Sequence, residues 1–513
     1  MSVTSTNPDT GERRELDLAE TTTEGVAALA ARASDASSAY AGLPLDRREA
    51  LLRAMADELE ADADSLVASA RFETALPEAR LRGELARTAF QFRFFAEVVH
   101  DGAFLAASID EATDSPMGPL PDLRRVKVPL GPVAVFGSSN FPFAFSVPGG
   151  DTASALAAGC AVVIKAHPAH PATSAACFAA LERAAARHGA PEGLLGLVFG
   201  LDAGTALVRA PEVAAVGFTG SLGAGRALWA LANAREVPIP FYGELGSANP
   251  LVVTAAAARE RSRAIGEGVA ASVALGAGQF CTKPGLIFVP AGADGDELVE
   301  ALGAHLGRDG VVTLLSEGIA ENFRRGARAL EVDGGASVLV AGQPGQAAHA
   351  AARLLEVDAA RFAREEALHA ECFGPLALVV RYGGPDDLRA ALEAAEPALT
   401  FTVHAVEADP DAAALVALGA RRAGRVLVNG YPTGVGVSWS MHHGGPWPAT
   451  TAAWATSVGA AAIERWLRPV TYQAVPEGLL PAALRDANPL GIVRRVNGRL
   501  EPPPVNNVTG NYT

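Results

Sequence analysis

Apolar and polar positions follow two different rhythms along the chain. Over residues 23–43 and 45–74, apolar residues recur at spacings of three and four with charged residues between them, which predicts amphipathic helices. A polar stretch with several prolines follows at residues 110–132, where we expect an extended hairpin or a linker. The opening part of the chain is therefore predicted to be mainly helical.

From about residue 131 the rhythm changes to short apolar runs, most of them ending in turn residues. Helical spacing follows the runs, and a second series of the same kind begins near residue 246. Strands that alternate with helices predict βαβ units and parallel sheets with covered faces. The runs are PVAVFG, AVVIKAHP, LLGLVFG and VAAVGFTGS, then NPLVVTAAA, GLIFVPA, ASVLVAG, LALVVRY and LTFTVHAV. The proline-punctuated tail at residues 476–491 is expected to pack on another part of the protein.

Composition and charge narrow the class of protein. A chain of 513 residues exceeds one ordinary core, so two or three domains are expected. The formal net charge of −15 argues against nucleic-acid binding, which needs clustered Lys and Arg. Neither a signal-peptide pattern nor an apolar run of membrane length is found, so no membrane partner is expected. Four cysteines are too few for a disulfide framework, which favours a reducing, cytoplasmic location.

The stretch GAGQFCTKPG, residues 276–285, places Cys281 between a glycine-rich approach and a Pro-Gly exit. The residue type alone allows a buried structural cysteine, a metal ligand or a nucleophile. His167 and His170 are three residues apart, but the prolines around them leave no helix to align them, so a metal site is not expected there. Structural roles are favoured for the other cysteines, Cys160, Cys177 and Cys372.

Four further features lie at predicted strand ends or turns, where open α/β sheets bind ligands. Asn140 could donate to an oxyanion, although Asn is also common in turns. Lys165 could meet a ribose or a phosphate, or simply be solvated. Glu244 could be a general base if burial raises its pKa, with an exposed loop glutamate as the alternative. A glycine-rich turn could approach a phosphate at a helix N-terminus or be no more than a turn; it contains Gly220, Ser221 and Gly225.

Taken in order, these motifs resemble the aldehyde dehydrogenase superfamily. The matching blocks are SNFPF, VVIKAHP, GFTGS, ELGSANP, GQFCTKPG and ECFGP, and the similarity runs from about residue 6 to about residue 492. FAFSVPGGDTASALAAG and MHHGGPWPATT are more specifically similar to the α-ketoglutaric semialdehyde (2,5-dioxovalerate) dehydrogenase branch. A fatty-aldehyde branch is also similar, so the choice between the two branches stays open.

The resemblance implies a role for each motif residue. Cys281 would be the nucleophile and Glu244 the general base, and the Asn140 amide with the Cys281 backbone N–H would hold the oxyanion. A thiohemiacetal on Cys281 would lose hydride to the nicotinamide and leave a thioester for water to hydrolyse. Because this chemistry needs a thiolate, a lowered pKa is expected for Cys281. No metal is implied, and the cofactor-binding residues would be Lys165, Gly220, Ser221, Gly225, Glu371 and Phe373.

The cofactor is expected to be NADP in preference to NAD. NAD-preferring relatives often carry a glutamate three residues after the lysine, and Pro168 occupies that position here. Without the carboxylate, Lys165 could pair with a 2′-phosphate free of like-charge repulsion. The expected substrate, α-ketoglutaric semialdehyde, needs a cationic anchor for its carboxylate. His442 and His443 are candidates by resemblance only, since adjacent histidines in a glycine-rich loop are more often structural.

The resemblance also implies an α/β fold with three parts and assembly as a homodimer or homotetramer. The parts would be a Rossmann-like cofactor domain (1–105 and 127–245, with part of 446–466), an α/β catalytic domain (246–445), and a small oligomerisation element with the tail (106–126 and 467–513). The enzyme alternatives are a long-chain aldehyde dehydrogenase, a CoA-acylating relative and a cofactor-free thiol hydrolase. A non-catalytic protein on the same fold is a further alternative, against which Cys281 and Glu244 together argue.

Overall fold

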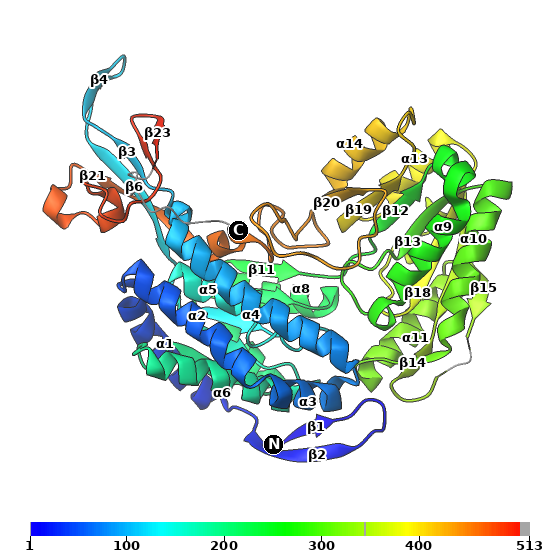
Figure 1. Cartoon of the computed structure of the whole chain (residues 1–513), viewed down its shortest axis with the longest axis horizontal. Coiled ribbons are helices and arrows are strands. Elements are labelled where there is room, and N and C mark those ends of the chain that lie inside the picture. Colours follow the sequence, from blue (N-terminus) through cyan, green and yellow to red (C-terminus); the bar gives the residue numbers. More distant parts are fainter. Residues whose placement is uncertain (1, 343–344, 503–513) are drawn as a thin grey trace.

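The computed structural model describes residues 2–342 and 345–502, and three sheets of five or more strands organise this part of the chain (Figure 1). One sheet is parallel throughout, the second is parallel except for an edge strand, and the third is mixed. Helices cover the first two sheets, so the predicted α/β class is confirmed.

Four long helices occupy the opening part of the chain, which confirms the prediction that this part is mainly helical. They are α1 (Thr23–Ala41), α2 (Leu45–Ala61), α3 (Ala63–Thr74) and α4 (Glu78–Asp101). α2 packs along α4, and both bury their apolar stripes in one large core, with Leu52 and Phe92 fully buried. A hairpin of β1 (Ser2–Thr6) and β2 (Arg13–Ala19) precedes them and was not predicted, because most of β2 is exposed and charged.

The first sheet has the strand order β11-β10-β7-β8-β9, all parallel. Its strands are β7 (Val133–Phe136), β8 (Val162–Lys165), β9 (Leu195–Val198), β10 (Ala215–Thr219) and β11 (Phe241–Glu244). Its helices are α5 (Gly150–Ala158), α6 (Pro171–Arg187), α7 (Leu201–Arg209) and α8 (Leu222–Asn233). The four predicted runs are all strands. β11 was not predicted because its sequence, FYGE, is too short and polar to stand out.

The second sheet has the order β15-β17-β18-β13-β12-β19-β20. Its strands are β12 (Pro250–Val253), β13 (Leu286–Pro290), β15 (Ser337–Ala341), β17 (Arg353–Asp358), β18 (Leu376–Tyr382), β19 (Ala398–His404) and β20 (Ala423–Val428). Its helices are α9 (Ala255–Ala274), α10 (Ala293–Leu306), α11 (Glu317–Val332), α12 (Ala359–Phe362), α13 (Pro385–Ala394) and α14 (Ala412–Arg422). β17 and β20 were not predicted, because charged residues interrupt their apolar runs.

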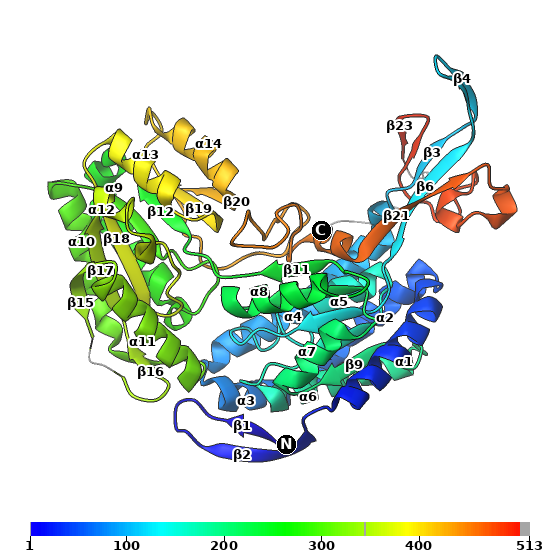
Figure 2. The same cartoon turned by 180° about the vertical axis from the view of Figure 1, so that it is seen from behind.

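A third sheet forms an arm that projects from the part of the molecule built on the first sheet (Figure 2). Its order is β21-β6-β3-β22-β23, and a separate pair, β14 (Val311–Thr313) and β16 (His349–Ala351), lies in the part built on the second sheet. The arm contains β3 (Ser108–Asp110), β6 (Leu123–Pro129), β21 (Leu467–Gln473), β22 (Arg494–Val496) and β23 (Arg499–Glu501). The expected hairpin is present as β4 (Thr113–Ser115) and β5 (Gly118–Leu120).

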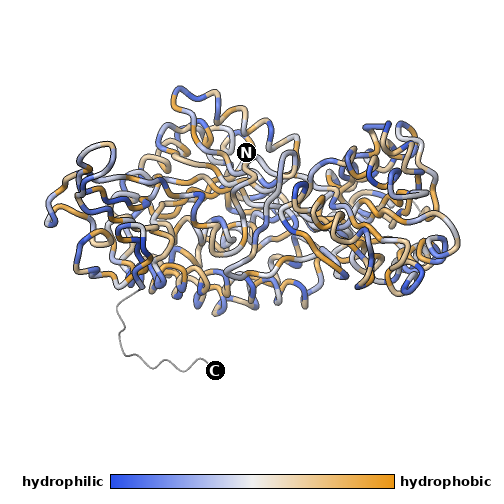
Figure 3. The backbone as a smooth tube through the Cα atoms, turned by 90° about the horizontal axis from the view of Figure 1, so that it is seen from above, coloured by the Kyte–Doolittle hydropathy of each residue, from blue (hydrophilic) through white to orange (hydrophobic). Residues whose placement is uncertain are grey.

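The tail packs on this arm, as its apolar residues predict. Leu480, Leu484 and Ile492 form a small core with Ile109 and Val126. Residues 503–513 of the predicted tail lie outside the described residues. Apolar and polar residues interleave along the coloured part of the backbone (Figure 3), and within the described residues we find no helix with the length and apolarity needed to span a bilayer.

Candidate active site

The Cys281 loop lies within the part of the chain that forms the second sheet, after α9 and a short 3₁₀ turn, η2 (Leu275–Gly278), and before β13. Gly278 has a φ of +69°, and a Cβ at this position would overlap the backbone of Gly374. Only glycine allows this approach, because an L side chain would be both strained and in collision. The glycine-rich approach that the sequence shows therefore brings Cys281 against the ECFGP loop.

Two buried side chains fix the Cys281 loop. The Asn249 amide donates to the carbonyls of Cys281 (2.7 Å) and Lys283 (2.9 Å). The Lys283 ammonium, 1% exposed, donates to the carbonyls of Cys372 (2.8 Å), Gly374 (3.0 Å) and Leu376 (2.8 Å). A buried ammonium needs such a full set of acceptors to offset its desolvation. Neither residue was among the predicted site residues.

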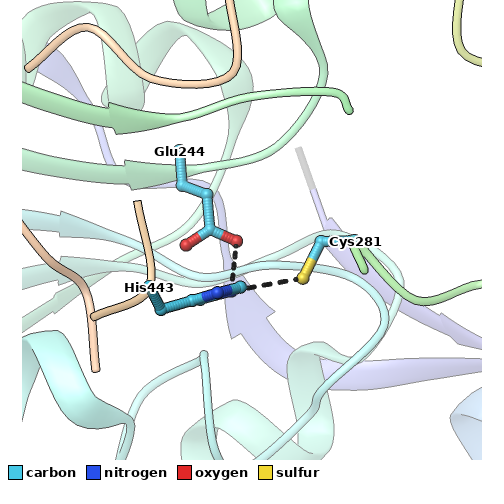
Figure 4. A group of neighbouring side chains, drawn as sticks. All are labelled: Glu244, Cys281 and His443. Carbon is cyan, nitrogen blue, oxygen red and sulfur yellow. Dashed lines mark hydrogen bonds and ion pairs between the residues drawn. The ribbon is translucent and has the colours of Figure 1, made fainter. Parts of the chain in front are cut away.

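Three side chains from distant parts of the chain converge beside this loop (Figure 4). His443 Nε2 lies 3.5 Å from Cys281 Sγ and 3.0 Å from Glu244 Oε1. The Ser457 hydroxyl donates to the other carboxylate oxygen of Glu244 at 2.6 Å. Glu244 ends β11, and an isolated bridge to Thr450 holds the end of that strand against the segment that carries His443.

The electrostatics of Cys281 and Glu244 differ from what the sequence led us to expect. Burial raises the pKa of the Cys281 thiol well above its usual range, and the Glu244 carboxylate raises it further, so the expected lowering is wrong for this state of the site. For Glu244, burial raises the pKa, but His443, Ser457 and Cys281 together outweigh it and lower it. The condition that the sequence analysis attached to a general-base role of Glu244, a pKa raised by burial, is therefore not met, and the carboxylate is ionised in this structure.

Asn140 lies in the loop after β7, beside the Cys281 segment. Its side-chain amide donates to the backbone carbonyl of Gln279 at 3.0 Å, and the backbone carbonyl of Asn140 accepts from the Arg80 side chain at 2.8 Å. The structure thus brings Asn140, Glu244 and Cys281 into one neighbourhood. An amide N–H and a backbone N–H close to a nucleophile are the groups that oxyanion stabilisation requires.

Four of the predicted cofactor residues, Lys165, Gly220, Ser221 and Gly225, lie at the end of β8 or between the end of β10 and the first turn of α8. Lys165 ends β8, and burial lowers its pKa to about 8. Ser221 caps α8, accepting from the Ala224 N–H, while Gly220 donates to the Glu244 carbonyl at 3.0 Å. A Cβ on Gly225 would overlap Leu245. An exposed helix N-terminus with a nearby buried cation is a site that fits the phosphates and ribose of a nicotinamide nucleotide.

Glu371 and Phe373 flank Cys372 in the ECFGP loop, which Lys283 holds against the Cys281 loop. The Glu371 carboxylate packs directly on the backbone at Gly246, two residues after Glu244. Burial raises its pKa to about 7, although Lys283 and the Ser247 backbone N–H act in the opposite direction. The loop therefore places the Glu371 carboxylate beside the segment that follows Glu244.

The residues that the sequence assigned to structure have structural surroundings. Cys160, Cys177 and Cys372 are buried free thiols, and burial raises the pKa of each. His170 lies within hydrogen-bonding distance of Ser174 and the Ser138 carbonyl. In the part of the chain that the structure describes, the one group of three ligand-type side chains close enough to share an ion is Glu244, Cys281 and His443, within 4.8 Å.

Sequence reasoning named His443 only as a possible substrate anchor and missed its contact with Cys281. Two cationic side chains near the thiol were also missed, Arg87 on α4 and Arg425 on β20. The adjacent histidines of MHHGGPWP were a visible signal, but which of the two faces the thiol depends on the loop conformation. The two arginines carried no sequence signal.

Comparisons with known proteins agree with this geometry. The model of the aldehyde dehydrogenase family matches residues 1–448. The chain belongs to the aldehyde dehydrogenase family. This aldehyde dehydrogenase is 49% identical over 476 residues to alpha-ketoglutaric semialdehyde dehydrogenase 2 of Azospirillum brasilense, covering 91% of this chain and 90% of that protein.

Two further comparisons extend this result. Alpha-ketoglutaric semialdehyde dehydrogenase of Acinetobacter baylyi is 42% identical over 488 residues, covering 94% of this chain and 93% of that protein. The crystal structure of an aldehyde dehydrogenase from Physcomitrella patens superimposes with a TM-score of 0.78 at 20% identity, covering 94% and 96% of the two chains, which shows the fold. The protein is therefore an NAD(P)-dependent oxidoreductase that acts on an aldehyde group.

Proposed function

We propose that this aldehyde dehydrogenase oxidises α-ketoglutaric semialdehyde to 2-oxoglutarate, with Cys281 as its nucleophile. The observation that carries the proposal is the 49% identity, over nine tenths of both chains, to a relative named for that substrate, together with the meeting of Cys281 and Glu244 in one site. The second relative with the same substrate name, at 42% identity, supports it.

The residues divide the chemistry between them. Cys281 attacks the aldehyde carbon, and the oxygen of the thiohemiacetal meets the Asn140 amide and the Cys281 backbone N–H. The nicotinamide cofactor, when bound, accepts the hydride. Glu244 then takes a proton from the water that hydrolyses the thioester, with its carboxylate oriented by Ser457. Lys165, Gly220, Ser221, Gly225, Glu371 and Phe373 hold the cofactor.

A cationic side chain near the thiol is suited to the substrate carboxylate. Arg87 Cζ lies 5.2 Å from the centre of the Phe145 ring, which in turn lies 6.3 Å from the His443 ring. The Nη1 atom of Arg87 is buried and has no hydrogen-bond partner among the described residues. Arg80 and Arg87 share one carboxylate, Glu84, so the pair carries excess positive charge. We assign the carboxylate anchor to Arg87.

We also propose that NADP is the preferred cofactor. Lys165 has no carboxylate among the groups that shift its pKa, and Pro168 occupies the position where a ribose-binding glutamate would repel a 2′-phosphate. A lysine ammonium without a competing carboxylate favours a phosphate partner.

Assembly and location complete the proposal. Two apolar side chains of the arm are exposed, Met117 (89%) in the turn between β4 and β5 and Leu500 (66%) on β23, and a partner subunit that covers them supports a homodimer or homotetramer. Within the described residues all four cysteines are free, which supports a cytoplasmic location.

Initial-rate kinetics test the function. We expect the highest kcat/KM for α-ketoglutaric semialdehyde with NADP and its loss in the Cys281→Ala variant. The control is Cys177→Ala, which removes a buried thiol outside the site. A preference for decanal would move the enzyme to the fatty-aldehyde branch, and no nucleotide reduction with either aldehyde would overturn the proposed substrate.

A further inference from the structure

A buried imidazole stands between the proposed nucleophile and the proposed base. His443 Nε2 is 3.5 Å from Cys281 Sγ and 3.0 Å from Glu244 Oε1, and the His443 side chain is completely buried (Figure 4). Its other ring nitrogen, Nδ1, is also buried and has no hydrogen-bond partner among the described residues. All of the polar contact that this imidazole makes is therefore through the one nitrogen that faces the thiol and the carboxylate.

The short segment Thr456–Ser457 holds both partners of the thiol. The His443 N–H donates to Thr456 Oγ1 at 2.8 Å, and the Ser457 N–H donates to the His443 carbonyl at 2.9 Å. The Ser457 hydroxyl donates to Glu244 Oε2 at 2.6 Å. One segment thus fixes the backbone of His443 and one oxygen of Glu244, which keeps Glu244 Oε1 directed at the ring.

A histidine that serves only packing would not need this arrangement. An apolar ring could fill the space beside Phe145, where the centroid distance is 6.3 Å. Burying two ring nitrogens costs free energy unless they gain partners, and only Nε2 has polar neighbours here. The free-energy cost of burying this imidazole is explained if Nε2 takes part in the chemistry of the Cys281 thiol.

The thiol itself needs a proton acceptor. Burial disfavours the Cys281 thiolate, and the negative charges of Glu244 and Glu371 disfavour it further, while the cations that face it are Arg425 and Arg87. Direct ionisation beside Glu244 would place two negative charges together in a buried site. Transfer of the proton to a neutral imidazole instead leaves a cation between them, and the ionised Glu244 stabilises that cation.

We propose that His443 is a catalytic base that removes the proton of the Cys281 thiol, a role that rests on Cys281 being the nucleophile of the proposed function. The Sγ–H bond breaks, its electron pair stays on sulfur, and the proton forms an Nε2–H bond on His443. The thiolate pair then forms the bond to the aldehyde carbon as the carbonyl electron pair moves to oxygen. His443 then gives this proton to solvent water, which leaves Glu244 ionised to activate the water that hydrolyses the thioester. The groups that face His443 are Glu244, Cys281 and the adjacent His442.

The rate of Cys281 alkylation by iodoacetamide, followed against pH without aldehyde or nucleotide, tests this role. A thiol that ionises directly reacts faster with each rise in pH up to its own high pKa. A thiol that gives its proton to a neighbouring base instead reacts at a rate that levels off once that base is unprotonated, below the raised pKa of the thiol itself. We expect the wild-type rate to level off below about pH 9, with Cys281→Ala giving the background from the three buried cysteines.

Substitutions separate the possible acceptors. His443→Asn is expected to be alkylated roughly tenfold more slowly, or worse, at about pH 7, with a rate that keeps rising beyond about pH 9. His442→Asn, the matched control one residue away, should keep the wild-type profile. The inference is overturned if His443→Asn keeps the wild-type profile shape, or if Glu244→Gln and not His443→Asn abolishes the levelling.

The wild-type profile decides the matter even if His443→Asn does not fold. A wild-type rate that rises throughout to about pH 9 and beyond contradicts the proposal. Because no aldehyde is present, the outcome is independent of substrate. A levelled profile in an enzyme that fails to oxidise the semialdehyde would overturn the proposed function and leave the role of His443 intact.

Discussion

The side-chain amide of Asn249 donates to the carbonyl of Cys281 at 2.7 Å and joins the start of β12 to the loop that carries the thiol. The same amide nitrogen also donates to the Ser247 and Lys283 carbonyls, and its oxygen accepts from Ser247, Thr400 N–H and Thr400 O–H. Asn249 is completely buried with a φ of +48°, a conformation that Asn tolerates better than most residues. Asn249 therefore fixes, together with Lys283, the position of the Cys281 loop relative to β12.

Asn249→Ala should lower both stability and turnover. Removing one amide leaves several buried donors and acceptors without partners, each costing about 1–3 kcal/mol. We expect a clear fall in the midpoint of thermal unfolding and a loss of kcat larger than the change in KM. Asn233→Ala, which removes one exposed hydrogen bond to the Trp229 carbonyl, is the control and should leave both quantities close to wild type. Wild-type turnover in Asn249→Ala would contradict this positioning role.

The pKa of about 7 for Glu371 predicts a pH dependence of cofactor binding. The carboxylate is ionised above that pH and protonated below it, so an ionised acceptor for ribose hydroxyls is lost as the pH falls. We expect the KM for the nucleotide to rise as the pH falls through about 7, and Glu371→Gln to show a raised KM without this dependence. A pH-dependent KM that persists in Glu371→Gln would assign the titration to another group.

The lowered pKa of Lys165 predicts the opposite pH dependence of KM, and only for NADP. Its pKa of about 8 means that the ammonium is charged below that pH and neutral above it. If it pairs with a 2′-phosphate, the KM for NADP should rise as the pH increases through about 8, while the KM for NAD changes much less. Lys165→Met should cost NADP binding roughly tenfold or more, as expected for a charge-assisted hydrogen bond. Equal effects on the two cofactors would contradict the NADP preference.

Arg87→Gln tests the substrate anchor. Loss of a cation that pairs with a substrate carboxylate typically costs 2 kcal/mol or more, so we expect kcat/KM for the semialdehyde to fall roughly 30-fold or more. Oxidation of an uncharged aldehyde such as butanal should be nearly unchanged. Arg82→Gln, on the exposed side of the same helix, is the matched control. An equal loss for both aldehydes would mean that Arg87 supports the site rather than binding the carboxylate.

Much of the fold was predictable because its strands are buried on both faces. β7, β8, β12 and β13 are continuous apolar runs, and such runs between helical stretches indicate a parallel sheet without further information. The strands that escaped prediction lie at edges or carry charges: β2 is solvated, β17 contains Arg353 and Glu356, and β20 contains Arg425. Edge strands need only one apolar face, so their sequences resemble loops.

Most residues of the candidate site could be predicted from sequence motifs, but the directions of their pKa shifts could not. Residue types at strand ends and turns indicated Asn140, Lys165 and Glu244. The GAGQFCTKPG stretch indicated Cys281, and the resemblance supplied the roles of all four residues. The directions of the Cys281 and Glu244 pKa shifts depend on their distance to each other and to His443, some 160 residues further along the chain. No local pattern encodes such a distance, because it arises only when the 443–457 segment returns to β11.

The roles of Cys281 and Glu244 are tested most directly by a single turnover of the Glu244→Gln variant with α-ketoglutaric semialdehyde and NADP, followed by mass spectrometry of the protein. Without the base that activates water, we expect one equivalent of reduced cofactor and a thioester on the Cys281 peptide. The mass increase should equal the aldehyde less two hydrogens. Continued turnover at the wild-type rate, or an adduct on any residue other than Cys281, would contradict these roles.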